Sequence, residues 1–158
     1  MKTRLIGNSV IALLCGLTLG VASAQDKDAS KAGKSSGGPS DPQIAGIVVA
    51  ANQIDVDAGK LAKSRSKNKD VSAFAQQMIT DHSASNKQAG ALVKKLGVKP
   101  EESDTSRGLK SAAKQTMGKL KGLKGDEFDR GYVDNEVAYH QQVLDAIDKV
   151  LIPSAKNA

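Results

Sequence analysis

The chain has 158 residues, a length that suits one domain and leaves no room for two substantial ones. Lys and Arg outnumber Asp and Glu by 23 to 17, so the chain is mildly basic with a formal net charge of +6. Aromatic residues make up 3% and there is no Trp, which argues against sugar-binding platforms, base-stacking surfaces and a β-sandwich. We therefore expect no nucleic-acid partner.

The first 24 residues have the pattern of a signal peptide. Lys2 and Arg4 form a short positive region, an apolar stretch follows over residues 10–21, and residues 22–24 (Ala-Ser-Ala) fit the cleavage site. The apolar stretch is short and interrupted by glycine, so it is a poor bilayer-spanning helix. We expect export to the periplasm or association with the outer membrane. Cleavage would remove Cys15, the only cysteine, so the mature chain would form no internal disulfide.

Residues 25–40 consist mainly of Lys, Asp, Ser, Gly and Pro, with almost no large apolar side chain. Such a segment cannot bury enough surface to offset the entropy lost on ordering. The sequence therefore predicts a flexible linker at 25–40, a folded domain at 41–152 and a C-terminal tail at 153–158.

Four segments of the predicted domain repeat apolar residues at three- and four-residue spacing, the period of a helix face. We predict helices at 41 to about 66, 70 to about 96, a shorter stretch around 109–123, and 126 to about 152. Asp41, Asp70 and Asp126 are the predicted helix starts, and Pro153 is the predicted stop. Since no segment alternates like a strand, the predicted fold class is all-α.

The predicted core faces of the second and last helices contain most of their apolar residues. They include Leu92 and Leu96 in the second helix and Val133, Val137 and Leu144 in the last. Ala and Gly are also frequent on these faces, and small residues let helix axes approach closely, as a bundle requires. We expect an up-and-down bundle of three long helices and one shorter basic helix.

The shorter helix carries six basic residues from Arg107 to Lys124, with no carboxylate between Thr105 and Gly125. One interpretation is an interaction module that docks on an anionic envelope surface or an acidic protein. The other is a solvated helix face whose charges pair with Asp and Glu elsewhere in the chain. Both interpretations remain open from the sequence.

Two histidines, His82 and His140, fall on predicted core-facing stripes. His82 follows Asp81, and His140 lies one helical turn after Glu136 on the same face. Neutral imidazole is the commonest metal ligand, and a nearby carboxylate either binds the ion or orients the ring. We therefore name His82, His140, Glu136 and Asp81 as candidate ligands of a divalent metal ion, with Asp55 of the first helix as a further carboxylate. The alternative is that both histidines are hydrogen-bonded core residues.

A di-iron carboxylate oxidase is not predicted. Such sites use Glu three residues before each ligating histidine, whereas Ile79 and Val137 occupy those positions here. The chain also contains no Gly-x-Ser-x-Gly turn, phosphate-binding loop or dinucleotide-binding fingerprint. We expect a protein that is not an enzyme.

Two runs of residues resemble the signatures of the DUF4142 family of exported bacterial helical proteins, often called putative outer membrane proteins. The first is Phe-Ala-Gln-Gln-Met-Ile-Thr-Asp-His at 74–82, followed by Asn86, and the second is Glu-Phe-Asp-Arg-Gly-Tyr-Val at 127–133, continuing to His140. The resemblance covers about residues 41–151. It implies a ferritin-like four-helix bundle of the periplasm or outer membrane, and it implies no established activity. His82, His140 and Asp81 match the family's histidine and Asp-His positions.

Members of that family usually continue into another long helix with its own histidine, and this sequence ends at Ala158. We expect one wall of the bundle either to be missing or to be supplied by the short basic helix. A missing wall would expose an apolar groove, and such patches drive association, including homo-oligomers. The leading hypothesis is an exported, non-enzymatic cell-envelope bundle related to stress or metal handling. The alternatives are a periplasmic metal-binding protein and the interaction module described above.

Overall fold

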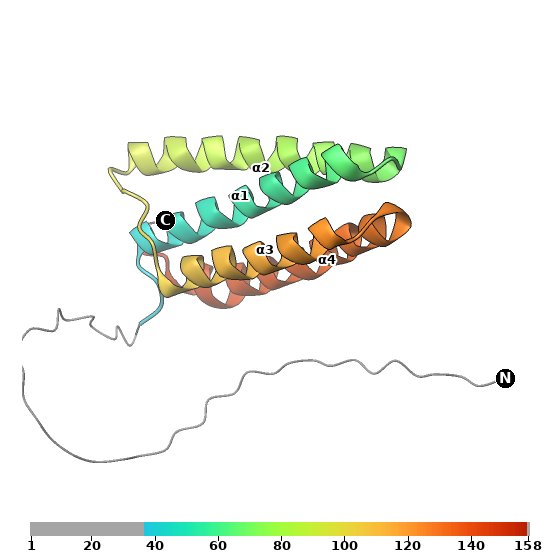
Figure 1. Cartoon of the computed structure of the whole chain (residues 1–158). Helices are drawn as coiled ribbons and strands as arrows, with labels where there is room; N and C mark the ends of the chain where they lie inside the picture. The colour runs from blue at the N-terminus through green and yellow to red at the C-terminus, as the bar shows by residue number, and fades with distance from the viewer. Residues whose placement is uncertain (1–36, 158) are drawn as a thin grey trace, which may run out of the picture. The chain divides into compact units, whose positions relative to one another are not determined.

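The computed structural model describes residues 37–157, so the predicted signal peptide and most of the predicted linker lie outside the described residues. The described helices are α1 (Asp41–Arg65), α2 (Lys69–Lys95), α3 (Asp104–Gly122), α4 (Gly125–Ala146), the π-helical turn η1 (Ile147–Leu151) and the short α5 (Ile152–Ser154). The four long helices run alternately in opposite directions (Figure 1). Within residues 37–157 there is no strand, which confirms the predicted all-α class. None of the described helices has the length and hydropathy of a membrane-spanning segment.

Helix α1 is the central element, because it contacts α2, α3 and α4, while α3 also contacts α4. The basic helix α3 therefore packs against both α1 and α4. The alanines of the α1–α2 interface, Ala58, Ala62 and Ala75, are fully buried or nearly so. Their small side chains let the two helices approach closely, and Phe128 and Tyr132 of α4 fill the space beside them.

Three helix starts differ from the prediction by one or two residues. Ser40, not Asp41, caps α1 in a reciprocal capping box with Gln43. Asn68, not Asp70, caps α2 by accepting hydrogen bonds from the first backbone amides. Helix α4 begins at Gly125 with no side-chain cap, so Asp126 lies inside its first turn. The aspartates instead place negative charge near the positive ends of the helix dipoles.

Pro153 was predicted to stop the last helix, and this prediction was wrong. The residue lies inside α5, which ends after Ser154. The preceding turn η1 is π-helical, and the backbone amide of Ile152 donates to the carbonyl of Ile147. A proline ring crowds the carbonyl four residues earlier in a regular α-helix, here that of Lys149. The wider π turn is how the chain accommodates this proline.

Several residues predicted to face the core are exposed instead. Leu92 of α2 and Leu96, which caps the end of α2, are 55% and 44% exposed. Val133, Val137 and Leu144 of α4 are also exposed. Helix α2 packs mainly on α1, so the described chain leaves part of its apolar face and part of that of α4 uncovered. The prediction of these residues as core was wrong because their stripes are wider than the surface that the neighbouring helices cover.

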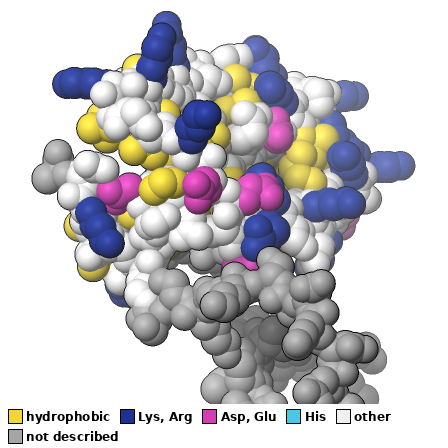
Figure 2. All heavy atoms as spheres, turned by 90° about the vertical axis from the view of Figure 1, so that its left-hand side faces the viewer, with side chains coloured by type: hydrophobic (Ala, Val, Ile, Leu, Met, Phe, Trp, Pro, Cys, Tyr) yellow, Lys and Arg dark blue, Asp and Glu magenta, His cyan; other side chains and the backbone are white. Residues whose placement is uncertain are grey.

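The basic residues of α3 are partly neutralised by their neighbours. Arg107 pairs with Asp104 at 2.6 Å, and Lys110 pairs with Glu102, whose carboxyl pKa is lowered by the hydrogen bond and charge of that lysine. On the face in Figure 2, Lys and Arg side chains are spread among hydrophobic and acidic ones rather than gathered in one patch.

Candidate metal centre

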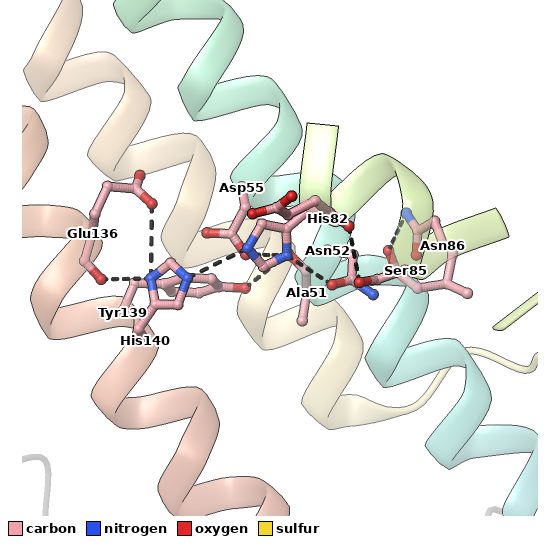
Figure 3. Close-up of polar contacts among 11 residues, drawn as sticks. Ala51, Asn52, Asp55, His82, Ser85, Asn86, Glu136, Tyr139 and His140 are labelled. Atoms are coloured by element: carbon pink, nitrogen blue, oxygen red, sulfur yellow. Dashed lines mark hydrogen bonds and ion pairs between the residues drawn. The ribbon is translucent and has the colours of Figure 1, made fainter. Parts of the chain in front are cut away.

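Three potential metal ligands from three different helices meet inside the bundle. Asp55 of α1, His82 of α2 and His140 of α4 can each offer one ligand atom such that all three atoms lie within 4.8 Å of one another. The close-up shows a nitrogen of each imidazole ring directed toward the other ring, with Asp55 beside them (Figure 3). Asp55 is 3% exposed, and both histidines are partly buried.

Helical spacing brings these side chains to the interior. Asp55 lies one turn after Ala51 and one turn before Ala58, and both alanines are buried on the inner face of α1. His140 lies one turn after Glu136, which is 1% exposed. Residues three or four apart share a helix face, so the same packing that buries these neighbours turns Asp55 and His140 toward the core.

Both rings have a hydrogen-bond acceptor beside Nδ1. His82 Nδ1 lies 2.8 Å from Asn52 Oδ1 and 3.4 Å from Asp55 Oδ2. His140 Nδ1 lies 2.8 Å from the backbone carbonyl oxygen of Glu136. Since these oxygens accept hydrogen bonds, we assign the ring proton to Nδ1 in each neutral histidine. Each Nε2 is then unprotonated and offers its lone pair.

The two Nε2 atoms lie 3.4 Å apart. With both rings in this tautomer their lone pairs repel, so a cation shared between the two nitrogens, either a proton or a metal ion, would stabilise the arrangement. Two ligand atoms bound to a tetrahedral ion at about 2.05 Å each would be about 3.3 Å apart. The separation of the two nitrogens therefore fits two ligands of one tetrahedral ion.

The carboxyl groups nearby also lack donors. Asp55 Oδ1 and both carboxyl oxygens of Glu136 are buried and accept no hydrogen bond of ordinary geometry, and the two carboxyl groups lie close enough to interact with each other. Burial raises the pKa of the Asp55 carboxyl, and burial together with the charge of Asp55 raises the pKa of Glu136 to about 8. Two imidazole nitrogens and two carboxyl groups thus form a cluster rich in acceptors, which a cation would stabilise.

Two residues that the sequence analysis did not single out support this cluster. Asn52 holds the ring of His82, as described above. Tyr139 donates its hydroxyl proton to the backbone carbonyl of Ala51 at 3.3 Å, and its ring meets that of His140 edge to face at 6.3 Å. A signal for Asn52 exists in the sequence: it lies three residues before Asp55, on the same side of α1.

The structure brings together His82, His140 and Asp55, and a carboxyl oxygen of Glu136 lies 3.8 Å from Nδ1 of His140. It does not bring Asp81 to this cluster. Asp81 is exposed, and its backbone carbonyl accepts a hydrogen bond from Ser85. Adjacent helix residues point about 100° apart, so Asp81 cannot share the face of His82. Asp55, which interrupts the apolar stripe of α1, is the carboxylate that reaches the rings.

The comparisons with known proteins give a family but no relative of known role. The family model described as "Domain of unknown function (DUF4142)" matches residues 24–158. A search of curated proteins and a search of solved structures each find no match.

Proposed function

Since the chain belongs to the DUF4142 family, whose description assigns no activity, we propose its function from the site itself: it binds a divalent transition-metal ion at Asp55, His82 and His140. The observation that carries the proposal is the 3.4 Å separation of the two Nε2 atoms, with a carboxyl oxygen of Asp55 within 4.8 Å of a nitrogen of each ring. The protein is a metal-binding component rather than an enzyme in this proposal.

The donor set favours one class of metal. Two imidazole nitrogens with a carboxylate oxygen suit Zn²⁺, Cu²⁺, Ni²⁺ or Fe²⁺, whereas Mg²⁺ and Ca²⁺ prefer sites made of oxygen alone. Asn52 and the backbone carbonyl of Glu136 orient the two histidines without binding the ion themselves. Each accepts a hydrogen bond from Nδ1 of one ring and so fixes the position of the proton and the orientation of that ring. Such outer contacts raise metal affinity by removing the cost of ordering the rings.

The test is a calorimetric titration of Zn²⁺ into the chelator-treated full chain and into two matched variants. Asp55→Asn removes the carboxylate inside the cluster, whereas Asp81→Asn makes the same change on an exposed residue next to His82. We expect one strong site per chain, weakened by about tenfold or more in Asp55→Asn and unchanged in Asp81→Asn. Cys15 is present in all three proteins and cannot cause the difference.

Equal affinity in all three proteins would contradict the proposal, and so would a loss confined to Asp81→Asn. His82→Gln provides a second disruption that keeps a polar side chain of similar length. Far-UV circular dichroism of each variant separates loss of the site from loss of the fold.

We also propose that the metal site works outside the cytoplasm. The support is the signal-peptide pattern of residues 1–24, which lies outside the described residues. Expression of the full chain in a bacterial host, followed by osmotic shock and mass spectrometry, should recover a protein that begins at Gln25. A cytoplasmic protein that retains residues 1–24 would contradict export.

A second candidate function, docking on an anionic envelope surface, is favoured by basic residues in the C-terminal half of α3 and in the turn after it. Lys114, Lys119, Lys121 and Lys124 are exposed and form no ion pair within residues 37–157. This candidate predicts binding to vesicles that contain anionic lipid, with an affinity that falls steeply as salt rises. Absence of binding, or binding insensitive to salt, would contradict it.

A further inference from the structure

An apolar pocket lies between α1, α3, α4 and the π turn, on another side of α1 from α2. Its volume is about 210 Å³. The walls are aliphatic and include Ile47, Ala51, Leu109, Val143, Ala146 and Ile147. The pocket opens to solvent where Thr105, Gln142 and Val150 are exposed, and the rest of its wall is apolar.

The pocket lies where α1 and α4 both present alanine side chains and where the α-helical backbone of α4 gives way to the π turn η1. Ala51 and Ala146 are too small to fill the space between α1 and α4, and η1 widens the chain directly after Ala146. Here the π turn supplies Ile147, Val150 and Leu151 to the pocket wall.

The chemistry of the wall defines the ligand. No lining residue carries a charge, and the polar ones are Asn52, Thr105 and Gln142, of which Thr105 and Gln142 are exposed. A charged group would lose its hydration there without gaining a partner. An apolar cavity of about 150 Å³ holds benzene, so this pocket has room for a somewhat larger molecule.

We propose that this pocket binds an uncharged apolar molecule somewhat larger than benzene, with any polar end directed to Thr105 or Gln142. The proposal is independent of the metal site, although Asn52 lines the pocket and also contacts His82. The experiment is therefore done on chelator-treated protein.

The test compares 1-octanol with octanoate, two probes of equal chain length that differ in charge. Each is titrated into the full chain while methyl signals are followed by NMR. We expect 1-octanol to saturate one site and to shift the methyl signals of Ile47 and Ile147, with Leu92 and Val137 unchanged. Octanoate should bind at least about tenfold more weakly, because its carboxylate has no cation in the pocket.

Two outcomes would overturn the proposal. Shifts at Leu92 and Val137 instead would mean that the alcohol binds the exposed apolar surface. Binding of octanoate as strong as that of 1-octanol would indicate attraction to the basic surface rather than to the pocket.

A pocket-filling variant checks the location. Ala146→Leu should weaken 1-octanol binding by about tenfold or more, since the added atoms occupy the space, whereas Ala73→Leu on the exposed face of α2 should leave it unchanged. Ala51→Val is a smaller filling change if Ala146→Leu fails to fold. Unaltered binding in a folded filling variant would also overturn the proposal, and the methyl shifts of the unmodified chain decide the matter without any variant.

Discussion

Replacing Glu136 by glutamine should make the metal-free protein more stable at neutral and alkaline pH. Glu136 is 1% exposed, its carboxyl oxygens have no hydrogen-bond partner, and its pKa is raised to about 8 from an ordinary value of 4.5. The folded state therefore holds the proton more tightly than the unfolded chain does. The contribution of Glu136 to stability is therefore fully present below about pH 4.5 and is lost as the pH rises toward 8, where the carboxylate becomes charged in the folded state too.

The magnitude follows from that difference in pKa. Ionised Glu136 costs the fold at most about 5 kcal/mol, a large part of the roughly 5–15 kcal/mol that stabilises a typical domain. Glutamine keeps the size of the side chain, carries no charge, and can donate to the unpartnered oxygen of Asp55. The variant should therefore gain several kcal/mol relative to the wild type at pH 8 and little at pH 5.

Urea denaturation with excess chelator, followed by far-UV circular dichroism at steps from pH 5 to pH 9, measures this difference. Glu127→Gln is the matched control, because Glu127 is an exposed glutamate of the same helix. Its curve should run parallel to that of the wild type. If the Glu136→Gln curve also runs parallel to the wild type, Glu136 is not ionising in a buried site, and the reasoning fails.

Other substitutions test the packing. Gly46→Ala should destabilise the protein by about 1–3 kcal/mol, because the new methyl group would meet the backbone carbonyl of Glu101. Gly118 faces open space, so Gly118→Ala should stabilise the protein by about 0.5–1 kcal/mol. The reverse order of stabilities in urea would refute this. Arg65→Lys should cost about 1–3 kcal/mol in the same assay, because the guanidinium donates to two carbonyls at the end of α3, at 2.7 and 2.9 Å, and lies over the ring of Phe128. An unchanged midpoint would show that these contacts contribute nothing.

The helices and the meeting of the two histidines could be predicted from the sequence because both depend on periodicity. An apolar stripe repeats many times along each helix, so one ambiguous residue does not hide it. His82 and His140 lie on such stripes, and the structure places both where α1, α2 and α4 meet, with the side chain of His140 still 39% exposed. The exact caps could not be chosen, because Ser40 and Asp41 lie next to each other and either can cap a helix.

The carboxylate of the site was harder to predict because it depends on how separate helices pack. Asp81 is next to His82 in sequence, but helical geometry turns it outward. Asp55 becomes a neighbour of His82 only through the relative position of α1 and α2 along their axes, which no local pattern specifies. The extent of the uncovered surface on α2 and α4 depends likewise on which helices pack there, and the stripes of Leu92 and Val137 carry no such information.

The most direct test of the central claim is a crystal structure of the full chain grown with Zn²⁺ and measured at the zinc absorption edge. We predict an anomalous peak at about 2.0–2.2 Å from Nε2 of His82, Nε2 of His140 and a carboxyl oxygen of Asp55. A peak confined to exposed carboxylates, or no peak between the two rings, would contradict the account and leave His82 and His140 as polar residues of the core.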